Sequence, residues 1–394
     1  MKSREIMKIQ LTLNGSKKIK QGYPLIQLED LVNPKWSNDW VELMNPQGEY
    51  IGTGYLGKQN KGIGWVLTRK KMPIDDSFFQ ALFEQAKKKR QPYYLDPLTS
   101  AFRLFNGEGD GLGGLIIDLY LEHAVFSWYN ETLYQKKPSI VASFQQAFPE
   151  IKGAYEKIRF EGDYPESLHL YGETAAELTL IQENGVTYAT YLNEGLMTGI
   201  FLDQKEVRGS LVDGLASGKT VLNMFSYTGA FSVAAVMGGA AKTTSVDLAK
   251  RSVPKTREQF EVNGIDPDTQ QIHVMDTFEY FKYAKRKELT FEVIILDPPS
   301  FARNKKKTFS VAKNYGELIE DSVDLLTDEG IIIASTNAAN VSPRQFQQMI
   351  EKAFAKKEVH YQKIKHYSLP SDFATVATFP EGDYLKVYCY EVKK

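Results

Sequence analysis

Three aspartates end strand-like runs and have the chemistry to act together on a ligand. The runs KTTSVD, QIHVMD and FEVIILD end in Asp247, Asp276 and Asp297. In open α/β sheets, ligands bind outside the carboxyl ends of the parallel strands. If the three runs are neighbouring strands, their carboxylates line one crevice. Such a crevice suits a ligand that donates hydroxyl and amino hydrogens, because ionised carboxylates only accept hydrogen bonds.

Asp247 and Asp276 each have a ligand interpretation and a structural one. Asp247 lies about 20 residues after Gly229, where a doubly wound fold places an acid on ribose hydroxyls. Capping of a helix from residue 248 is the alternative, and the series of strand-end acids favours ribose. Asp276 either binds an adenine amino group or caps the helix that starts at Phe278, and the sequence gives these two equal weight.

The run TVLNM is followed by a bulky turn. Asn223 lies near its end, and Phe225-Ser226-Tyr227-Thr228-Gly229 follow. A dinucleotide site would show G-x-G-x-x-G, whose glycines let the backbone approach a pyrophosphate, but this turn has one glycine. A ligand without a pyrophosphate fits better. We favour S-adenosylmethionine (SAM), a nucleoside with an amino acid tail and a sulfonium, packed on the aromatic rings of the turn, over a nicotinamide dinucleotide.

Two prolines and then a basic stretch follow Asp297. Pro299 restricts Pro298 to extended conformations, so the strand has a stiff exit that can aim the Asp297 carboxylate and the Pro298 carbonyl into the crevice. Both groups accept hydrogen bonds from an amino or ring N–H of a base, and Phe301 is placed to stack on that base. A paired base must be flipped out to arrive there. Residues 303–307 would then hold backbone phosphates, which predicts binding that weakens with salt.

The pattern that must position these residues begins at about residue 186. Strands alternate with helices of about 10 to 15 residues, which is typical of βαβ units in a parallel, doubly wound sheet. The expected strands are 220–229, 242–247, 271–276, 291–297 and 331–336, and the expected helices are 230–240, 248–264, 277–287, 315–330 and 342–357. The last stretch, 384–394, reads as an antiparallel edge strand.

Two further regions precede this one. Residues 1–73 show short strands around an Asn-Pro-Gln-Gly turn, which suggests a small barrel. Residues 74–185 read as a mixed α+β domain with a helix over 75–94, capped by Asp75 or Asp76 and ended by Pro92. Its glycine-rich stretch 107–114 favours a tight hairpin over a phosphate loop, because acids within it would repel phosphate.

Composition excludes several classes of protein. The 394-residue chain is 42% hydrophobic, which suffices for packed cores in two or three domains, and no apolar run is long enough for a membrane helix. The N-terminus lacks the pattern of a signal peptide, so we expect a cytoplasmic protein. Cys389 is the only cysteine, and neither it nor the five histidines predict a metal site. The net charge is −1, with basic patches at 1–20, 84–90 and 301–313 as local candidates for phosphate binding.

Several motifs in order resemble one family. TGIFLDQK (198–205), VLNMFSYTGAFS (221–232), SVDLAKRSVPKTREQFEVNG (245–264), LDPPSFARNKK (296–306) and ATFPEGDYLK (377–386) resemble the bacterial SAM-dependent methyltransferases with an N-terminal PUA domain. Members of that family modify large-subunit ribosomal RNA. The resemblance extends over nearly the whole chain, since FNGEGDGLGGLIID (105–118) is similar to its central hairpin and WVELMNPQGEYIGTGYLGKQNKGIGWVL to its PUA domain.

The resemblance implies an α/β fold of three domains: a PUA RNA-binding barrel (1–73), a small central α+β domain (74–185) and a Rossmann-like class I methyltransferase domain (186–394). It also implies roles for single positions. Near SAM it places Phe201, Asp203, Gln204, Asn223, Phe225, Ser226, Tyr227, Thr228 and Gly229, with Asp247 on the ribose and Asp276 and Thr277 on the adenine side. Asp297 falls at the methyl-transfer end. Lys205 stands where the family usually has arginine, which loses a bidentate donor.

One departure concerns the reaction. Members that make 5-methylcytosine attack the base with a cysteine from a Ser-Cys-Ser-like motif after the fifth strand, and here that motif reads Ser335-Thr336-Asn337. Carbon 5 is a poor nucleophile without a covalent adduct, whereas a base nitrogen needs only positioning and acceptance of a proton. Cys389, in the C-terminal strand, reads as a buried packing residue. Asp297 and Asn337 are then the candidates for holding the base, with Pro298 and Phe301.

The sequence therefore predicts a SAM-dependent methyltransferase of an RNA base, with 23S ribosomal RNA as the expected partner. Two alternatives stay open: a methyltransferase of a protein or small molecule, and an RNA-binding factor that keeps SAM without catalysis. The sequence does not fix the oligomeric state and leaves a homodimer through an apolar edge open.

Overall fold

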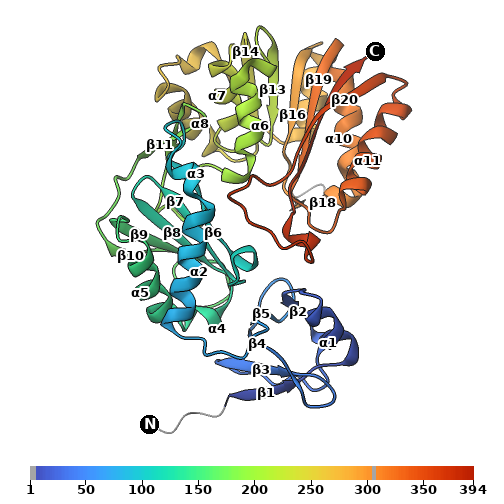
Figure 1. Ribbon diagram of the computed structural model, residues 1–394. Helices are drawn as coiled ribbons and strands as arrows, with labels where there is room; N and C mark the ends of the chain where they lie inside the picture. The colour runs from blue at the N-terminus through green and yellow to red at the C-terminus, as the bar shows by residue number, and fades with distance from the viewer. Residues whose placement is uncertain (1–5, 304–307) are drawn as a thin grey trace. The chain divides into compact units, whose positions relative to one another are not determined.

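The computed structural model describes residues 6–303 and 308–394 (Figure 1). Residues 304–307 of the predicted phosphate-binding stretch therefore lie outside it. The chain forms two compact units that exchange segments. The first contains the chain up to Ile181, Thr190–Thr198 and Ser371–Gly382, and the second contains Gln182–Ala189, Gly199–Pro370 and Asp383–Lys394. The three domains with boundaries after residues 73 and 185 stay a prediction.

The first sheet of unit 1 lies within the first 68 residues. Its strands are β1 (Met7–Gln10), β2 (Leu25–Ile26), β3 (Trp40–Met44), β4 (Tyr50–Leu56) and β5 (Gly64–Thr68), in the order β1-β3-β4-β5-β2. The Asn-Pro-Gln-Gly turn joins β3 to β4, because Asn45 accepts from the backbone N–H groups of Gln47 and Glu49. Helix α1 (Leu13–Lys20) was not predicted: its sequence is polar and contains Gly15, and the signal that the pattern offered was the Thr12 cap, which accepts from Gly15 N at 3.0 Å.

The second sheet of unit 1 has the order β10-β9-β8-β7-β6. These strands are β6 (Ala101–Asn106), β7 (Leu115–Tyr120), β8 (His123–Trp128), β9 (Gly153–Ile158) and β10 (Ser167–Gly172), with helices α4 (Glu131–Tyr134) and α5 (Lys137–Ala147) between β8 and β9. Strands β6 and β7 pair antiparallel on either side of the glycine-rich stretch, which confirms the hairpin. The short helix η2 (Gly107–Asp110) forms part of that connection.

The predicted helix 75–94 is two helices. Helix α2 (Asp76–Lys89) begins after Asp75, which accepts from the backbone N–H groups of Ser77 and Phe78, so the predicted cap is confirmed. Helix α2 ends at Lys89, three residues before the predicted stop at Pro92, and α3 (Gln91–Tyr94) follows with Pro92 in its first turn. Proline is disfavoured inside a helix but fits a first turn, and it restricts the residue before it, so it restarted the helix instead of ending it.

The seven-stranded sheet of unit 2 positions the site. Its strands are β13 (Thr220–Met224), β14 (Lys242–Asp247), β15 (Gln271–Val274), β16 (Phe291–Leu296), β19 (Leu326–Thr336), β20 (His360–Tyr367) and β21 (Lys386–Lys393), in the order β15-β14-β13-β16-β19-β21-β20. The first five in this order are parallel, which confirms the doubly wound fold. The chain builds outward from β13 in both directions, so β13 and β16 flank the switch point where α/β sheets bind ligands.

Helices cover both faces of this sheet (Figure 1). Alternate residues of β16 point to opposite sides: Ile294 and Leu296 pack with α9 (Thr277–Arg286), α10 (Val311–Leu325) and α11 (Pro343–Lys356), whereas Val293 and Ile295 pack with α6 (Lys205–Ser210) and α7 (Ala230–Met237). Burial on both faces explains why FEVIIL reads as one apolar run.

Several predictions in unit 2 are wrong, beginning with the strand 220–229, which ends at Met224 as β13. Helix α10 ends at Leu325, and the next five residues, predicted as helix, already belong to β19. Helix α8 (Ser252–Glu261) begins four residues later than predicted. The C-terminal strand β21 is antiparallel as predicted but is not the edge, because β20 pairs along its outer side. Every residue of β20 is at least partly exposed, so it lacked the apolar signal of a strand.

The remaining elements are short. They are β11 (Thr179–Glu183) with β12 (Val186–Thr190), β17 (Phe301–Arg303) with β18 (Thr308–Ser310), and the single turns η1 (Leu28–Asp30), η3 (Leu202–Gln204), η4 (Leu211–Leu215), η5 (Pro267–Thr269) and η6 (Pro380–Gly382). No helix within residues 6–303 and 308–394 is long and apolar enough to cross a membrane.

Candidate active site

The turn after β13 is a strained cradle. Phe225 and Tyr227 have φ values of 58° and 52°, a left-handed conformation that L-residues other than glycine rarely adopt. The backbone N–H of Ser226 donates to Val246 O at 3.0 Å, and that of Tyr227 donates to Asp247 Oδ2 at 2.9 Å. These bonds tie the turn to the end of β14. Strain held in place by neighbouring structure is typical of functional sites.

The predicted turn residues divide into exposed rings and buried anchors. Phe225 and Tyr227 stay partly exposed, and Tyr227 lies 5.3 Å from the ring of Phe201. Thr228 is buried and donates to Gly199 O at 2.7 Å, while Gly229 precedes α7 as its N-cap residue with φ 78°. Other members anchor the strand: Ser226 is buried, and Asn223 is buried and donates to Ser232 Oγ at 2.9 Å. A contact of Asn223 with SAM stays a prediction.

Asp247 holds the backbone of its own turn and of the neighbouring one. Its Oδ1 accepts from Ala249 N at 2.8 Å and its Oδ2 from Tyr227 N at 2.9 Å. It does not cap a helix, since α8 begins at Ser252 after Arg251. Each carboxylate oxygen accepts two hydrogen bonds, so this arrangement leaves one position on each oxygen for a ribose hydroxyl.

Asp276 caps α9. Its Oδ1 accepts from Phe278 N at 3.0 Å and from Glu279 N at 3.3 Å, so the capping alternative is confirmed. Thr277, the first residue of α9, is buried. The ring of Phe278 lies 6.0 Å from Phe309, and Phe225 lies 6.3 Å from the same ring. An aromatic group therefore connects the turn after β13 with the first turn of α9, and it provides a surface of the kind on which an adenine stacks.

Asp297 lies at the end of β16, beside the switch point. The amide nitrogen of Gln204 donates to Asp297 Oδ1 at 3.0 Å and to Ser335 Oγ at 2.8 Å. Burial raises the pKa of Asp297 to about 6, and the nearby Asp203 carboxylate acts in the same direction. Hydrogen bonds from Ser335 and Gln204 act the other way, as does the positive charge of Arg208. A carboxyl group with such a pKa exchanges protons near neutral pH, as a general base must.

The neighbours of Asp297 on η3 and α6 are fixed by buried contacts. Tyr384 donates to Asp203 Oδ2 at 2.9 Å. Arg208 forms a buried bidentate ion pair with Glu183, at 2.6 and 2.8 Å, and also donates to Phe201 O at 2.8 Å. Through that last bond the ion pair sets where the segment with Phe201 and Asp203 lies. Sequence reasoning missed Arg208 and Glu183, because an arginine and a glutamate far apart in the chain carry no local pattern.

The other residues predicted to hold the base lie on the exits of β16 and β19. Pro298 is buried, and Phe301 is 60% exposed at the start of β17, which leaves its ring available for stacking. Asn337 is exposed and accepts from Ser300 Oγ at 2.6 Å. Tyr315 contacts the ends of both strands, since its hydroxyl donates to Ser335 O at 2.8 Å and to Leu296 O at 3.3 Å. Sequence reasoning gave no role to Ser300 or Tyr315.

No thiol reaches this region. Thr336, in the middle of the motif in which relatives carry a cysteine, is fully buried, and its hydroxyl accepts from Ala338 N at 3.1 Å. Cys389 is fully buried in β21 opposite Ile333, where burial raises the pKa of its thiol to about 12. Its predicted packing role is confirmed.

These residues fit SAM. Gln204 Oε1 is buried without a hydrogen-bond partner beside Asp297. A buried acceptor of this kind is unfavourable for stability and therefore points to a functional constraint on this segment. Carboxylates from η3, β14 and β16 suit the positive charges of a sulfonium and an ammonium, and the exposed rings of Phe201 and Tyr227 supply the apolar and cation-binding surface. The residues that would hold SAM are those of the 225–229 turn, Phe201, Asp203 and Asp247.

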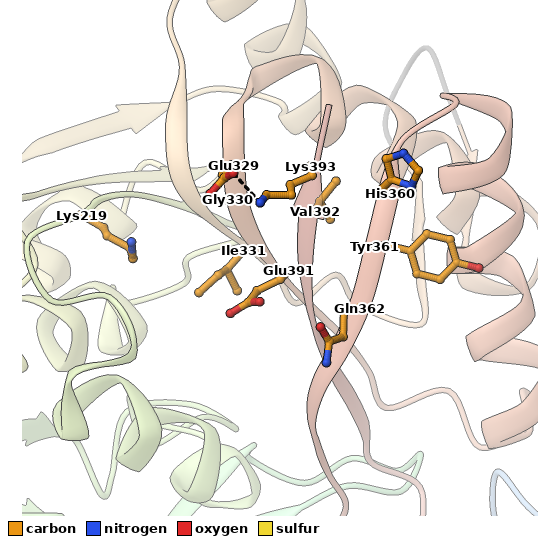
Figure 2. A pocket seen from close by; sticks show the side chains of 10 residues that line it. All are labelled: Lys219, Glu329, Gly330, Ile331, His360, Tyr361, Gln362, Glu391, Val392 and Lys393. Carbon is orange, nitrogen blue, oxygen red and sulfur yellow. Dashed lines mark ion pairs between the residues drawn. The ribbon is translucent and has the colours of Figure 1, made fainter.

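A cavity of about 480 Å³ lies elsewhere in unit 2 (Figure 2). It lies toward the other ends of the strands: Lys219 precedes β13, and Glu329 and Gly330 lie in the first half of β19. Figure 2 shows the ion pair between Glu329 and Lys393 at its wall. None of the predicted site residues lines it, so we place the chemistry at the switch point, where strained backbone and a partly buried acid with a raised pKa occur together.

Comparisons with known proteins show which family the chain is similar to. The model of the S-adenosylmethionine-dependent methyltransferase family matches residues 157–380, and that of a PUA-like domain matches residues 9–69. The chain is 47% identical to the Bacillus subtilis protein YwbD, named as a ribosomal RNA large subunit methyltransferase, over 95% of this chain and 97% of that protein. It is 30% identical to ribosomal RNA large subunit methyltransferase I of Shewanella denitrificans, over 89% of each chain.

Two solved structures share the fold. SMU.776, described as a methyltransferase and complexed with SAH, superposes with a TM-score of 0.93 at 48% identity, over 98% of this chain and all of that one. A SAM-dependent methyltransferase from Streptococcus mutans gives 0.91 at 47% identity, with the same coverage. The family model spans more than half of the chain and these relatives nearly all of it, so the protein belongs to the S-adenosylmethionine-dependent methyltransferase family and carries a PUA-like domain.

Proposed function

We propose that this methyltransferase modifies a base of RNA, and that its substrate is the 23S RNA of the large ribosomal subunit. The relatives named as large-subunit ribosomal RNA methyltransferases support this, because similarity to them extends over both the PUA-like region and the methyltransferase region. The PUA-like domain is the part that we expect to bind RNA outside the active site. We also propose a cytoplasmic location, where ribosomal RNA is found in bacteria.

The observation that carries the proposal is Asp297, a partly buried acid with a pKa of about 6 at the switch point of the sheet. SAM, when bound, supplies an electrophilic methyl group on a sulfonium. Asp297 then accepts a hydrogen bond from a base N–H, orients that nitrogen and receives its proton. Phe301 stacks on the base, and the rigid Pro298-Pro299 exit keeps the acid aimed.

We propose that the methylated atom is a nitrogen. Carbon 5 of cytosine requires a nucleophile that adds to carbon 6. The thiol of Cys389 is buried and protonated, and the hydroxyl of Thr336 is buried and engaged by the backbone of Ala338. Acceptors such as Asp297 suffice for a nitrogen, since its lone pair is the nucleophile once its proton is accepted.

The test is transfer of a labelled methyl group from SAM to ribosomal RNA taken from a strain that lacks this gene. We expect Asp297→Ala to reduce transfer at least about 100-fold, in line with the loss of a general base, while RNA binding stays within about 2-fold. Cys389→Ser is the control and should keep its activity. Wild-type turnover in Asp297→Ala would refute the role of the acid.

Mass mapping of the RNA from that strain identifies the base and atom. A missing methyl on a base nitrogen supports the proposal, and a missing 5-methylcytosine contradicts the nitrogen assignment. Transfer to protein or to a small molecule, with none to RNA, favours the first alternative function. SAM binding without any transfer favours an RNA-binding factor that keeps SAM as a structural ligand. A homodimer stays a prediction that light scattering would test.

A further inference from the structure

We propose that Gln204 is a positioning residue of the methyl-transfer site, which holds the Asp297 carboxylate together with Ser335 in the orientation and the ionised form that accept a proton. The inference rests on the proposed function, because it assigns a role toward the acid of that site. It extends that function to a glutamine and a serine that act on the acid and not on the RNA.

The geometry is that of one donor shared by two acceptors. Gln204 ends η3 and is 3% exposed, and its Nε2 lies 3.0 Å from Asp297 Oδ1 and 2.8 Å from Ser335 Oγ. Strands β16 and β19 are parallel neighbours in which Leu296 pairs with Ala334. Asp297 and Ser335 are the next residues along the two strands, so they lie side by side at the carboxyl edge of the sheet. The amide of Gln204 thus links the carboxyl ends of β16 and β19 by hydrogen bonds.

The orientation of this amide is costly for stability alone. With Nε2 on Asp297, Gln204 Oε1 is left buried without a partner, and a buried acceptor without a hydrogen bond costs about 1–3 kcal/mol. A reversed amide would place oxygen against the carboxylate, which is tolerable only if Asp297 is protonated. This arrangement is the one that suits an ionised Asp297, because hydrogen bonds to charged groups are the stronger ones.

Charged, titratable and hydrogen-bonding groups on four neighbouring elements surround Asp297. Asp203 on η3 opposes its ionisation, and Arg208 on α6 favours it from within the ion pair with Glu183. Tyr315 on α10 is neutral, since burial holds the pKa of its hydroxyl well above the usual value. Ser335 on β19 supports ionisation by hydrogen bonding. Gln204 donates to the carboxylate and to this serine, so its loss should favour the protonated acid.

Gln204→Met and Gln204→Glu test the inference. Methionine fills a similar volume without a donor, and glutamate replaces the donor by a second acid. The matched control is Gln259→Met: Gln259 is also buried, and its amide bonds only to the backbone of Ala189, at 2.8 Å in both directions. The full-length variants are compared by the pH dependence of methyl transfer and by titration of the Asp297 carboxyl carbon in ¹³C NMR, assigned by its absence in Asp297→Asn.

We expect wild-type transfer to rise with a midpoint near pH 6. In Gln204→Met the midpoint should move up by about one pH unit, so that transfer at pH 6 falls several-fold and largely recovers at pH 9, and Gln204→Glu should move it at least as far. The NMR midpoint should move with it. Unchanged midpoints, or an equal shift in Gln259→Met, would overturn the inference. If the wild type transfers nothing to RNA while the NMR midpoint still shifts, the proposed function fails and the positioning role stands.

Discussion

Asp297 shows the conflict between stability and function at a single residue. Its folded-state pKa of about 6 lies above the usual aspartate value of 3.8. A raised pKa means that the stability due to this group is present below the unfolded value and is lost as pH rises through the folded value. Stability is therefore lost as pH rises from about 4 to about 6, and the full cost of the charge applies above pH 6, the range in which the proposed reaction needs the carboxylate.

We predict that Asp297→Asn is inactive in methyl transfer yet more stable at neutral pH. Asparagine keeps an oxygen for the Gln204 donor and has no charge to bury. A shift of about two pKa units corresponds to about 3 kcal/mol. The difference in unfolding free energy between variant and wild type should therefore grow by up to about 3 kcal/mol between pH 4 and pH 7.5. Urea denaturation at intermediate pH values would measure it, and a difference independent of pH would show that the acid is not strained by burial.

Site residues at recognisable positions of the sequence, such as strand ends, were predictable. Residues whose role depends on a partner far away in the sequence were not. Asp247, Asp276 and Asp297 stood out because each ended a predicted strand, and the structure places all three at the carboxyl edge of one sheet. Ser335 and Arg208 were missed as parts of the site. Their roles depend on Asp297 and Glu183, partners that only the packing of distant strands and helices brings within reach.

At the scale of elements, the turn between β13 and α7 combines strain and function. Tyr227 has φ 52°, its N–H is fixed on Asp247, and its ring lies against Phe201. The backbone conformation and the ring can be separated by substitution. Glycine and alanine both remove the ring, but only glycine adopts this φ without cost.

We therefore predict that Tyr227→Gly is about 1 kcal/mol more stable than Tyr227→Ala, the left-handed strain outweighing the greater entropy of unfolded glycine. Both variants should lose similar affinity for SAM, because both lose the ring. Thermal unfolding and calorimetry with SAM measure the two quantities. Equal stability of the two variants would show that the turn relaxes, and unchanged SAM affinity in both would remove the tyrosine ring from the cofactor site.

Periodicity predicted most elements of the parallel sheet, and it failed where local signals conflict. Strands β13 and β16 and the second half of β19 are buried and read as apolar runs that end at an acid or a polar turn, whereas no residue of β15 is buried. The stretch LTDEG after α10 was predicted as the end of the helix, because its acids continue the helical pattern, yet β16 and β21 pair with β19 and draw it into the sheet. Strand β20 forms through its pairing with β21 and not through its own composition.

At the scale of the whole molecule, the compact units are not made of consecutive stretches of the chain. Residues 371–382 follow β20 in the sequence, but they belong to unit 1. There Asn106 donates to Ala374 O at 2.8 Å, Arg103 N donates to Asp372 Oδ2 at 2.8 Å, and Phe379 packs edge-on against Trp65 at 5.8 Å. No composition shift marks this segment, so a division into consecutive domains could not have predicted it.

Arg90 is the centre of this returning segment, and it gives the last prediction. It is fully buried, donates to both oxygens of Asp110 at 2.7 and 2.6 Å, and donates to Asp372 O at 2.6 Å. Burial alone would raise the pKa of Asp110, but the hydrogen bonds and charge of Arg90 bring it below its usual value. Arg90→Met should cost about 3–5 kcal/mol, because it leaves a buried carboxylate without its main partner.

The control is Lys89→Met, which removes a half-exposed partner of the same carboxylate and the same unit of charge. It should cost about 1 kcal/mol or less, since an exposed ion pair contributes little. Hydrogen exchange should also separate the two: residues 371–382 should lose protection in Arg90→Met and keep it in Lys89→Met. Equal effects would mean that general charge, and not the buried fork of Arg90, holds the returning segment in unit 1.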